Sequence, residues 1–300
     1  MGNYFSSIGH AGRFRTKKSL IAGENTSETM LPPLIYGTAW KQEATAVLTE
    51  TAVRAGFRGI DTANQKKHYR EDFVGDALLA LKKQGVKRED LFLQSKYTYK
   101  EGQDHRLPYN PADPYAKQVK DSFENSLKNL HTDYLDSYLL HGPRSGRGLT
   151  PEDWEVWAAM EALHQSGQAR CIGVSNVGLH HLEALWEKAK IKPQFVQNRC
   201  FAVSGWDQDV REFCQGHKII YQGFSLLTAN PKVVLHPQTL AMARRLQVTP
   251  MQIIFRFSVQ IGILPLTGTT QLEHMEQDLA IGTFQLSAQD IAEIHALSNA

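Results

Sequence analysis

Residues 56–63 read GFRGIDTA, a short run in which a β-branched residue is followed directly by Asp61. Two later runs share this form: residues 91–97 read LFLQSKY and carry Lys96, and residues 135–141 read LDSYLLH and end at His141. Short runs rich in apolar and β-branched residues are typical of buried strands. We therefore interpret each run as a buried strand whose last residues leave the core.

Eight such runs alternate with segments of helical periodicity from residue 34 onward. The predicted strands are residues 34–38, 58–63, 91–97, 135–141, 171–176, 195–198, 219–225 and 263–267. The predicted helices are residues 43–55, 72–84, 114–129, 151–166, 179–190, 207–215, 236–246, 251–261, 272–281 and 287–297. Two of these helices have clear start signals, because Thr150 stands before Pro151 and Ser287 stands before the last helix.

The alternation favours an α/β fold of the (β/α)₈ barrel type. Parallel strands need helical crossovers, and eight of them close a barrel within about 250 residues. Residues 34–300 supply that length, and residues 1–33 are predicted to form a disordered or extended N-terminal tail. An open doubly wound sheet is the alternative, but neither a G-x-G-x-x-G fingerprint nor a Walker A loop occurs in the sequence.

The predicted strand ends carry residues that are capable of acid–base chemistry. Asp61, Lys96 and His141 each lie near the C-terminal end of a different predicted strand, and barrel enzymes place their sites at these strand ends. An aspartate keeps a neighbouring lysine charged, and a charged lysine lowers the pKa of a nearby tyrosine hydroxyl. Such a tyrosine would protonate a carbonyl oxygen as hydride reaches the carbon, while His141 orients that carbonyl.

Composition excludes several other classes of function. The 33 Lys and Arg against 31 Asp and Glu leave a net charge of +2, which argues against a nucleic-acid partner. A mean hydropathy of −0.37 and the lack of any apolar run near about 18 residues argue against a membrane-spanning helix. Three cysteines predict reduced thiols in a cytoplasmic protein, and the lack of H-E-x-x-H and C-x-x-C motifs predicts no metal site.

Taken together, these runs resemble the aldo-keto reductase superfamily. The resemblance is carried in chain order by residues 56–63, 94–96, 138–141, 172–176, 197–198, 223–227 and 264–269. It implies a (β/α)₈ barrel that reduces aldehydes or ketones, or oxidises sugar-type alcohols, with NADP(H). It also implies a catalytic tetrad, which in this sequence is Asp61, Tyr69, Lys96 and His141.

A cofactor site is implied by the same resemblance. Its members here are Ser175, Asn176, Gln197, Phe224, Ser225, Leu227, Leu266, Thr267, Gly268, Thr269, His274, Gln277 and Asp278. The first three would hold the nicotinamide carboxamide, and Phe224 would stack on the nicotinamide ring. Ser225 and Leu227 would follow the pyrophosphate. The members of the list from Leu266 to Asp278 would surround the adenosine phosphate.

Two departures from the family pattern affect this site. The family tyrosine stands five residues after the aspartate, where this chain has Lys66, so Tyr69 lies three residues further on and His68 is the alternative proton donor. The family often has Lys in place of Leu266 and Arg near His274, cations that bind the 2′-phosphate of NADPH. NADP(H) is therefore favoured, and NAD(H) stays open.

The substrate side departs from the family pattern as well. Many members cover the pocket with a long segment after the last helix, and this sequence ends directly after that helix, which predicts a pocket open on that side. The pocket for a small-molecule carbonyl or alcohol substrate would then be lined by Tyr36, Trp40, Tyr97 and Tyr99. Arg144 and Arg147 would attract an anionic substrate, or belong to an ordinary solvated loop.

The tail leaves several readings open. It starts MGNYFS, which fits N-myristoylation at Gly2, and its basic residues would add weak membrane association. A mitochondrial transit peptide and a tail without a targeting role are the alternatives. A lipid signal would suit a second function, a cofactor-binding regulatory subunit of a membrane protein with little turnover. A non-redox barrel enzyme, such as a sugar isomerase or an aldolase, is the third hypothesis.

Overall fold

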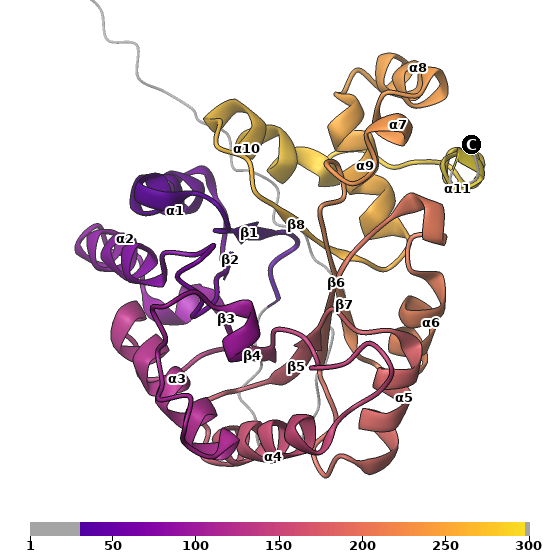
Figure 1. Cartoon of the computed structure of the whole chain (residues 1–300). Helices are drawn as coiled ribbons and strands as arrows, with labels where there is room; N and C mark the ends of the chain where they lie inside the picture. The colour runs from indigo at the N-terminus through magenta and orange to yellow at the C-terminus, as the bar shows by residue number, and fades with distance from the viewer. Residues whose placement is uncertain (1–30, 298–300) are drawn as a thin grey trace, which may run out of the picture.

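The computed structural model describes residues 31–297, in which eight parallel strands close into a barrel in sequence order (Figure 1). The strands are β1 (Ile35–Gly37), β2 (Gly59–Asp61), β3 (Phe92–Tyr97), β4 (Ser137–Leu140), β5 (Ile172–Ser175), β6 (Phe195–Arg199), β7 (Ile220–Phe224) and β8 (Leu264–Thr267). The barrel closes where β1 pairs with β8, with Ile35 opposite Leu266. The predicted (β/α)₈ fold and its eight strands are confirmed.

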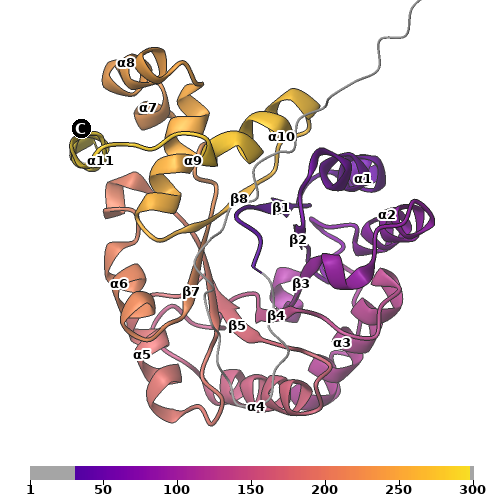
Figure 2. The same cartoon turned by 180° about the vertical axis from the view of Figure 1, so that it is seen from behind.

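Helices form a ring around this barrel in both views (Figures 1 and 2). They are α1 (Thr45–Ala55), α2 (Glu71–Lys83), α3 (Tyr115–Leu130), α4 (Pro151–Gln165), α5 (Leu179–Lys188), α6 (Gln208–Gly216), α7 (Pro231–Val234), α8 (Pro237–Leu246), α9 (Pro250–Gln260), α10 (Leu272–Leu279) and α11 (Ala288–Ala296). Thr150 and Ser287 cap α4 and α11 as predicted, each by accepting a backbone N–H bond. The sequence did not predict α7, because a single turn is too short to show an apolar period.

Alternate residues of each strand point into the barrel, so the interior is stacked in layers. On β3 the inward residues are Phe92, Gln94 and Lys96. Phe92 belongs to a buried apolar cluster with Phe195 of β6, and their ring centres lie 5.6 Å apart. Gln94 and Lys96 follow toward the C-terminal ends of the strands. An apolar floor therefore fills the N-terminal half of the barrel, and polar side chains occupy the half where the loops open.

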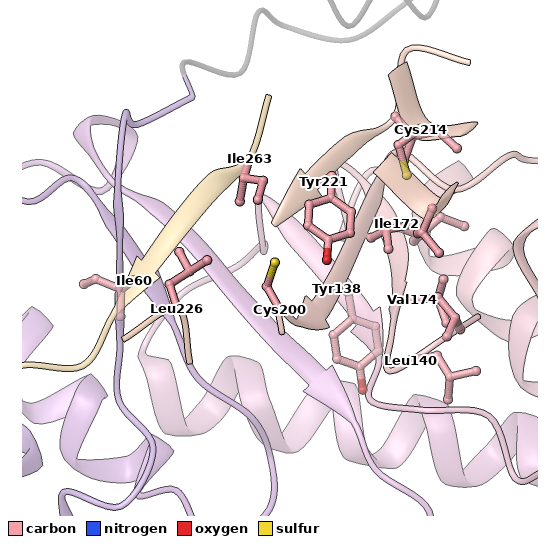
Figure 3. Packing of buried hydrophobic residues seen from close by; sticks show 14 of the residues in the cluster. Ile60, Tyr138, Leu140, Ile172, Val174, Cys200, Cys214, Tyr221, Leu226 and Ile263 are labelled. Carbon is pink, nitrogen blue, oxygen red and sulfur yellow. The ribbon is translucent and has the colours of Figure 1, made fainter. Parts of the chain in front are cut away.

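The outward residues of the same strands pack against the helices. Figure 3 shows part of this cluster, including Tyr138 and Leu140 of β4 and Ile172 and Val174 of β5. All four side chains are almost completely buried. Each buried apolar side chain of this size stabilises the fold by about 1.5–3 kcal/mol. The three cysteines of the chain are also buried, and none forms a disulfide.

The predicted tail, residues 1–33, lies almost entirely outside the described residues, and Gly2 is among those not described. Within residues 31–297 no helix combines the length and the apolar character that a bilayer crossing needs. The acylation and targeting hypotheses for the tail stay predictions.

Helices α2 and α3 approach each other closely at Gly75. A Cβ atom at this position would lie 1.8 Å from the Asn129 carbonyl oxygen. The neighbouring Asn129 side chain donates a hydrogen bond to Glu71, which in turn accepts one from Ser95 beside Lys96. The absence of a side chain at Gly75 thus sets the spacing of two helices that support the end of β3.

We expect Gly75→Ala to lower the free energy of unfolding by about 1–3 kcal/mol, because the added methyl group must push α3 away. Urea denaturation followed by circular dichroism measures this change. Gly216→Ala is the matched control, since no atom lies within 4 Å of a Cβ there, and its effect should stay within about 0.5 kcal/mol. Equal effects of the two substitutions would contradict the steric argument.

Candidate active site

An ion pair between Lys96 and Asp61 lies at the C-terminal end of the barrel. Lys96 Nζ donates to Asp61 Oδ1 at 2.6 Å, to Asp61 Oδ2 at 2.7 Å and to the Thr62 carbonyl oxygen at 2.9 Å. Both charged side chains are buried. Burial lowers the pKa of Lys96, and the Asp61 carboxylate opposes that shift. Three acceptors around one ammonium group thus compensate for the loss of its water.

Tyr69 reaches this ion pair across the longer loop. Its ring centre lies 5.3 Å from Lys96 Nζ and 5.9 Å from the centre of the His141 ring. The extra residues are absorbed by a turn in which the backbone N–H groups of His68 and Tyr69 both donate to the Gln65 carbonyl oxygen. The buried Gln65 side chain ties this turn to the loop after β3 through a bond of 2.6 Å.

The protonation state of Tyr69 corrects one sequence-based expectation. Burial and the Asp61 carboxylate raise the pKa of Tyr69, whereas Lys96 was expected to lower it. The reason is that Lys96 contacts Asp61 at 2.6 Å, so the pair presents little net positive charge to the phenol. Tyr69 therefore keeps its proton at neutral pH, which is the form of a phenol that can act as an acid.

The His141 ring packs against Tyr69 in a T-shaped arrangement. Its Nδ1 shares a hydrogen bond of 2.7 Å with the Thr98 hydroxyl group. Burial, and then the positive charge of Lys96, lower the pKa of His141 to about 3, so the imidazole is neutral at ordinary pH. His68, the alternative proton donor, stacks instead on Trp40, with ring centres 3.9 Å apart.

Three glutamines, which we call the amide layer (Gln94, Gln197 and Gln222), lie directly beneath the ion pair. Gln94 Nε2 donates to Asp61 Oδ1 at 2.7 Å, and Gln197 Nε2 donates to the same oxygen at 3.0 Å. Gln222 accepts from both neighbours and donates back to Gln94. The strand register produces the layer, because Asp61 pairs with Gln94 and Gln197 with Gln222.

Sequence reasoning missed Gln94 and Gln222, although a usable signal was present. Gln94 stands two residues before Lys96 on β3, and Gln222 stands two residues before Phe224 on β7. A spacing of two places both residues on the inward face of their strands. An uncharged polar residue at such a position needs a polar partner inside the barrel.

A cavity of about 1230 Å³ opens above the ion pair. Asp61, Tyr69 and His141 line it, while Lys96 lies behind them. Its wall also contains every residue that the resemblance assigned to the cofactor, namely Ser175, Asn176, Gln197, Phe224, Ser225, Leu227, Leu266, Thr267, Gly268, Thr269, His274, Gln277 and Asp278. The volume exceeds the range of about 300–1,000 Å³ that is typical of small-molecule pockets.

On the substrate side, Trp40 and Tyr99 line the cavity, whereas Tyr36 and Tyr97 do not. Tyr36 is fully buried and donates to the Thr269 carbonyl oxygen at 2.9 Å, and Tyr97 is buried in the cluster between strands and helices. This corrects the expectation for both. Tyr97 directly follows the inward-pointing Lys96, and a step of one residue along a strand reverses the face.

The charges at the cavity rim include Arg144, for which the sequence left open an anion-attracting role and a place in an ordinary solvated loop. Arg144 forms an ion pair of 2.8 Å with Glu101 and lies over the ring of Tyr99, so its charge is already balanced. Lys41, which follows β1 and was not singled out in the sequence, is buried and donates to the Gly268 carbonyl oxygen at 2.7 Å. Burial lowers the pKa of Lys41 to about 8. A cation thus lies against the loop after β8, where Leu266 supplies none.

Comparison with known proteins identifies the family of this chain. Residues 33–230 match the model of the aldo/keto reductase family. The chain belongs to this family. Its members are oxidoreductases that act on carbonyl groups and generally use nicotinamide cofactors.

Relatives of this aldo/keto reductase cover most of its length. The glyoxal reductase of Bacillus subtilis (strain 168) is 32% identical over 250 residues, which span 83% of this chain and 82% of the relative. Human aldo-keto reductase family 1 member C3 is 31% identical over 280 residues, spanning 83% and 81%. The crystal structure of an aldo/keto reductase from Brucella melitensis is 28% identical, covers 89% of this chain and 95% of that chain, and superposes with a TM-score of 0.75.

The neutral His141 should leave a signature in the pH dependence of stability. Between pH 6.5 and about 3 the unfolded chain binds a proton at this imidazole and the folded reductase does not. The free energy of unfolding therefore falls as the pH is lowered through this window, by up to about 1.4 kcal/mol per pH unit. In His141→Gln this contribution is lost, so urea denaturation of the two proteins should converge at acid pH. Parallel curves from pH 7 to pH 4 would rule out a neutral His141.

Proposed function

We propose that this aldo/keto reductase reduces aldehydes or ketones with NADPH, and that Tyr69 is the proton donor. One observation carries the proposal: a protonated Tyr69 and a neutral His141 meet the Lys96–Asp61 pair at the base of one large cavity. The cavity wall extends from this point to Gly268 and Thr269 after β8, where the resemblance places the adenosine phosphate of the cofactor.

Each residue of the tetrad, Asp61, Tyr69, Lys96 and His141, would have its own role in the reduction. A reduced nicotinamide, when bound, supplies the hydride that reaches the carbonyl carbon. Tyr69 gives its phenolic proton to the carbonyl oxygen. The Lys96 ammonium, 5.3 Å from the Tyr69 ring centre, stabilises the negative charge left on the phenol oxygen only in part, because Asp61 balances most of the lysine charge. Asp61 keeps Lys96 charged and in place. We assign the Thr98 hydroxyl as the donor in its hydrogen bond with Nδ1, so that the neutral His141 carries its proton on Nε2 and orients the carbonyl by donating to it.

Lys41 supports NADPH as the preferred cofactor. Its ammonium group lies at the Gly268 carbonyl oxygen, beside the segment that the family uses for the adenosine phosphate. Thr267 and Thr269 on the same loop line the cavity and offer hydroxyl groups. With a pKa of about 8, Lys41 still carries its charge at pH 7, and burial has removed much of its water. An anion that binds there therefore compensates for lost solvation and stabilises the charged form.

The substrate side favours carbonyl compounds with an apolar or aromatic group. Trp40 is 67% exposed and Phe201 is 38% exposed, and both stand in the cavity wall. No described cation beyond the paired Arg144, Lys41 and Arg199 lines the cavity, so its substrate side has little charge to select an anion. Since one relative is a glyoxal reductase, small dicarbonyl compounds belong in the same substrate panel.

Tyr69→Phe should lower kcat for NADPH-dependent reduction of 4-nitrobenzaldehyde by about 10²–10⁴-fold, because no acid then protonates the carbonyl oxygen. The Kd for NADPH, measured by fluorescence quenching, should stay unchanged. Tyr134→Phe is the control, since this tyrosine lies between Arg88 and Arg170, away from the cavity. Equal kcat values in wild type and Tyr69→Phe would remove Tyr69 from the mechanism. Tight NADPH binding by the wild type without turnover of any carbonyl would instead favour a regulatory role.

Lys41→Met should weaken NADPH binding by about tenfold or more, and NADH binding much less, because only NADPH carries the extra phosphate. In the wild type the preference for NADPH should decline from pH 7 to pH 9, as Lys41 loses its proton near pH 8. Fluorescence titration at several pH values measures both effects. Lys188→Met, at an exposed site on α5, is the control. A preference that does not change with pH would exclude Lys41 as the phosphate ligand.

A further inference from the structure

The amide layer does more than fill the barrel. We infer that Gln94 and Gln222 are positioning residues, which lock the amide of Gln197 so that its carbonyl oxygen, and not its NH₂ group, faces the cavity. The inference rests on the proposed function for its ligand, a nicotinamide dinucleotide. Gln94 and Gln222 are 1% and 0% exposed and do not line the cavity, so they act through Gln197.

Asp61 dictates the orientation of the layer. A carboxylate that is paired with Lys96 offers only acceptor oxygens, so an amide beside it must present N–H. Gln94 and Gln197 do so at 2.7 Å and 3.0 Å, both toward Oδ1. Turning either amide over would bring a carbonyl oxygen against the negative charge. Asp61 therefore holds one N–H of Gln94 and one N–H of Gln197, and it leaves the direction of the second N–H of each amide to Gln222.

Gln222 then holds the second N–H of each neighbour. Its Oε1 accepts from Gln94 Nε2 at 2.8 Å and from Gln197 Nε2 at 2.9 Å. Its own Nε2 donates to Gln94 Oε1 at 3.0 Å, which fixes its orientation in turn. Both N–H groups of Gln197 are thus held inside the barrel. The Oε1 atom of Gln197 is the polar atom of this side chain left for the cavity.

A ligand group that meets Gln197 must accordingly donate a hydrogen bond. The carboxamide NH₂ of a nicotinamide does so. An acetyl group at the same ring position does not, and its methyl group would leave the Gln197 oxygen without a partner. The layer thereby selects a carboxamide over an acetyl group, although two of its three members never touch the ligand.

The test compares the Kd of the protein for NADP⁺ with its Kd for the 3-acetylpyridine analogue of NADP⁺. This binding measurement does not require the enzyme to turn over a substrate. The wild type should bind NADP⁺ about 3- to 10-fold more tightly, as expected for one hydrogen bond. In Gln222→Met the second N–H of Gln197 loses its acceptor and can turn to the cavity, so the ratio of the two Kd values should approach one. Gln222→Asn, whose shorter amide cannot reach Gln197, should act in the same way if the methionine variant does not fold.

Two further variants separate positioning from a general structural effect. Gln222→Glu should restore the ratio, because a carboxyl group that is protonated by burial beside Asp61 both accepts and donates as the amide does. Gln118→Met is the matched control, a buried glutamine that bonds to Tyr97 and to the Asp113 carbonyl oxygen outside the layer, and it should leave the ratio unchanged.

Equal affinity of the wild type for the two dinucleotides, or a full ratio in folded Gln222→Met or Gln222→Asn, would overturn this inference and leave the proposed reductase activity intact. A wild-type protein that binds neither dinucleotide would overturn the proposed function together with the inference.

Discussion

The buried ion pair between Lys96 and Asp61 is the constraint on which the upper half of the barrel depends. Removing two charges from water costs several kcal/mol for each ion unless close partners compensate. Lys96 finds three acceptors, and Asp61 accepts from two amides in addition to the ammonium group. Burial is the larger cause of the raised pKa of Tyr69 and of the lowered pKa of His141, and the charges of Asp61 and Lys96 add to these two shifts. Asp61 also accepts one N–H from each of two members of the amide layer.

The layered interior explains how a barrel accommodates such a pair. Each strand presents alternate residues to the inside of the barrel. One strand can therefore contribute one residue to the apolar N-terminal half, one to the amide layer and one to the candidate active site. The strand β3 does this with Phe92, Gln94 and Lys96. The aromatic floor keeps water out from below, where the Phe92 and Phe195 rings meet. The amides above it supply the donors that an apolar wall could not.

The loop between β2 and α2 shows how an insertion is tolerated near a site. Three additional residues would displace Tyr69 if they were added to a regular extension of the strand. A compact turn instead absorbs them, and it is anchored on one side by Gln65. On the other side Asn64 donates to the Ser122 carbonyl oxygen and to Asn125 of α3. Buried side-chain amides on both sides therefore fix the position of the tyrosine.

The sequence by itself determined the eight strands, their polar ends and the helix caps at Thr150 and Ser287. These features are local, because periodicity and capping depend on residues a few positions apart. It also indicated Asp61 and His141 through their places at strand ends, and the family resemblance extended this to the cofactor wall.

Only the tertiary structure decided whether a side chain points toward the cavity or toward the helices, and which residues distant in the sequence it contacts. It turned Tyr36 and Tyr97 away from the cavity, and it brought Lys41 to Gly268, 227 positions further along the chain. It also joined Gln94 to Gln222 across the barrel. Strand register and barrel closure set these contacts, and neither leaves a pattern in the order of neighbouring residues.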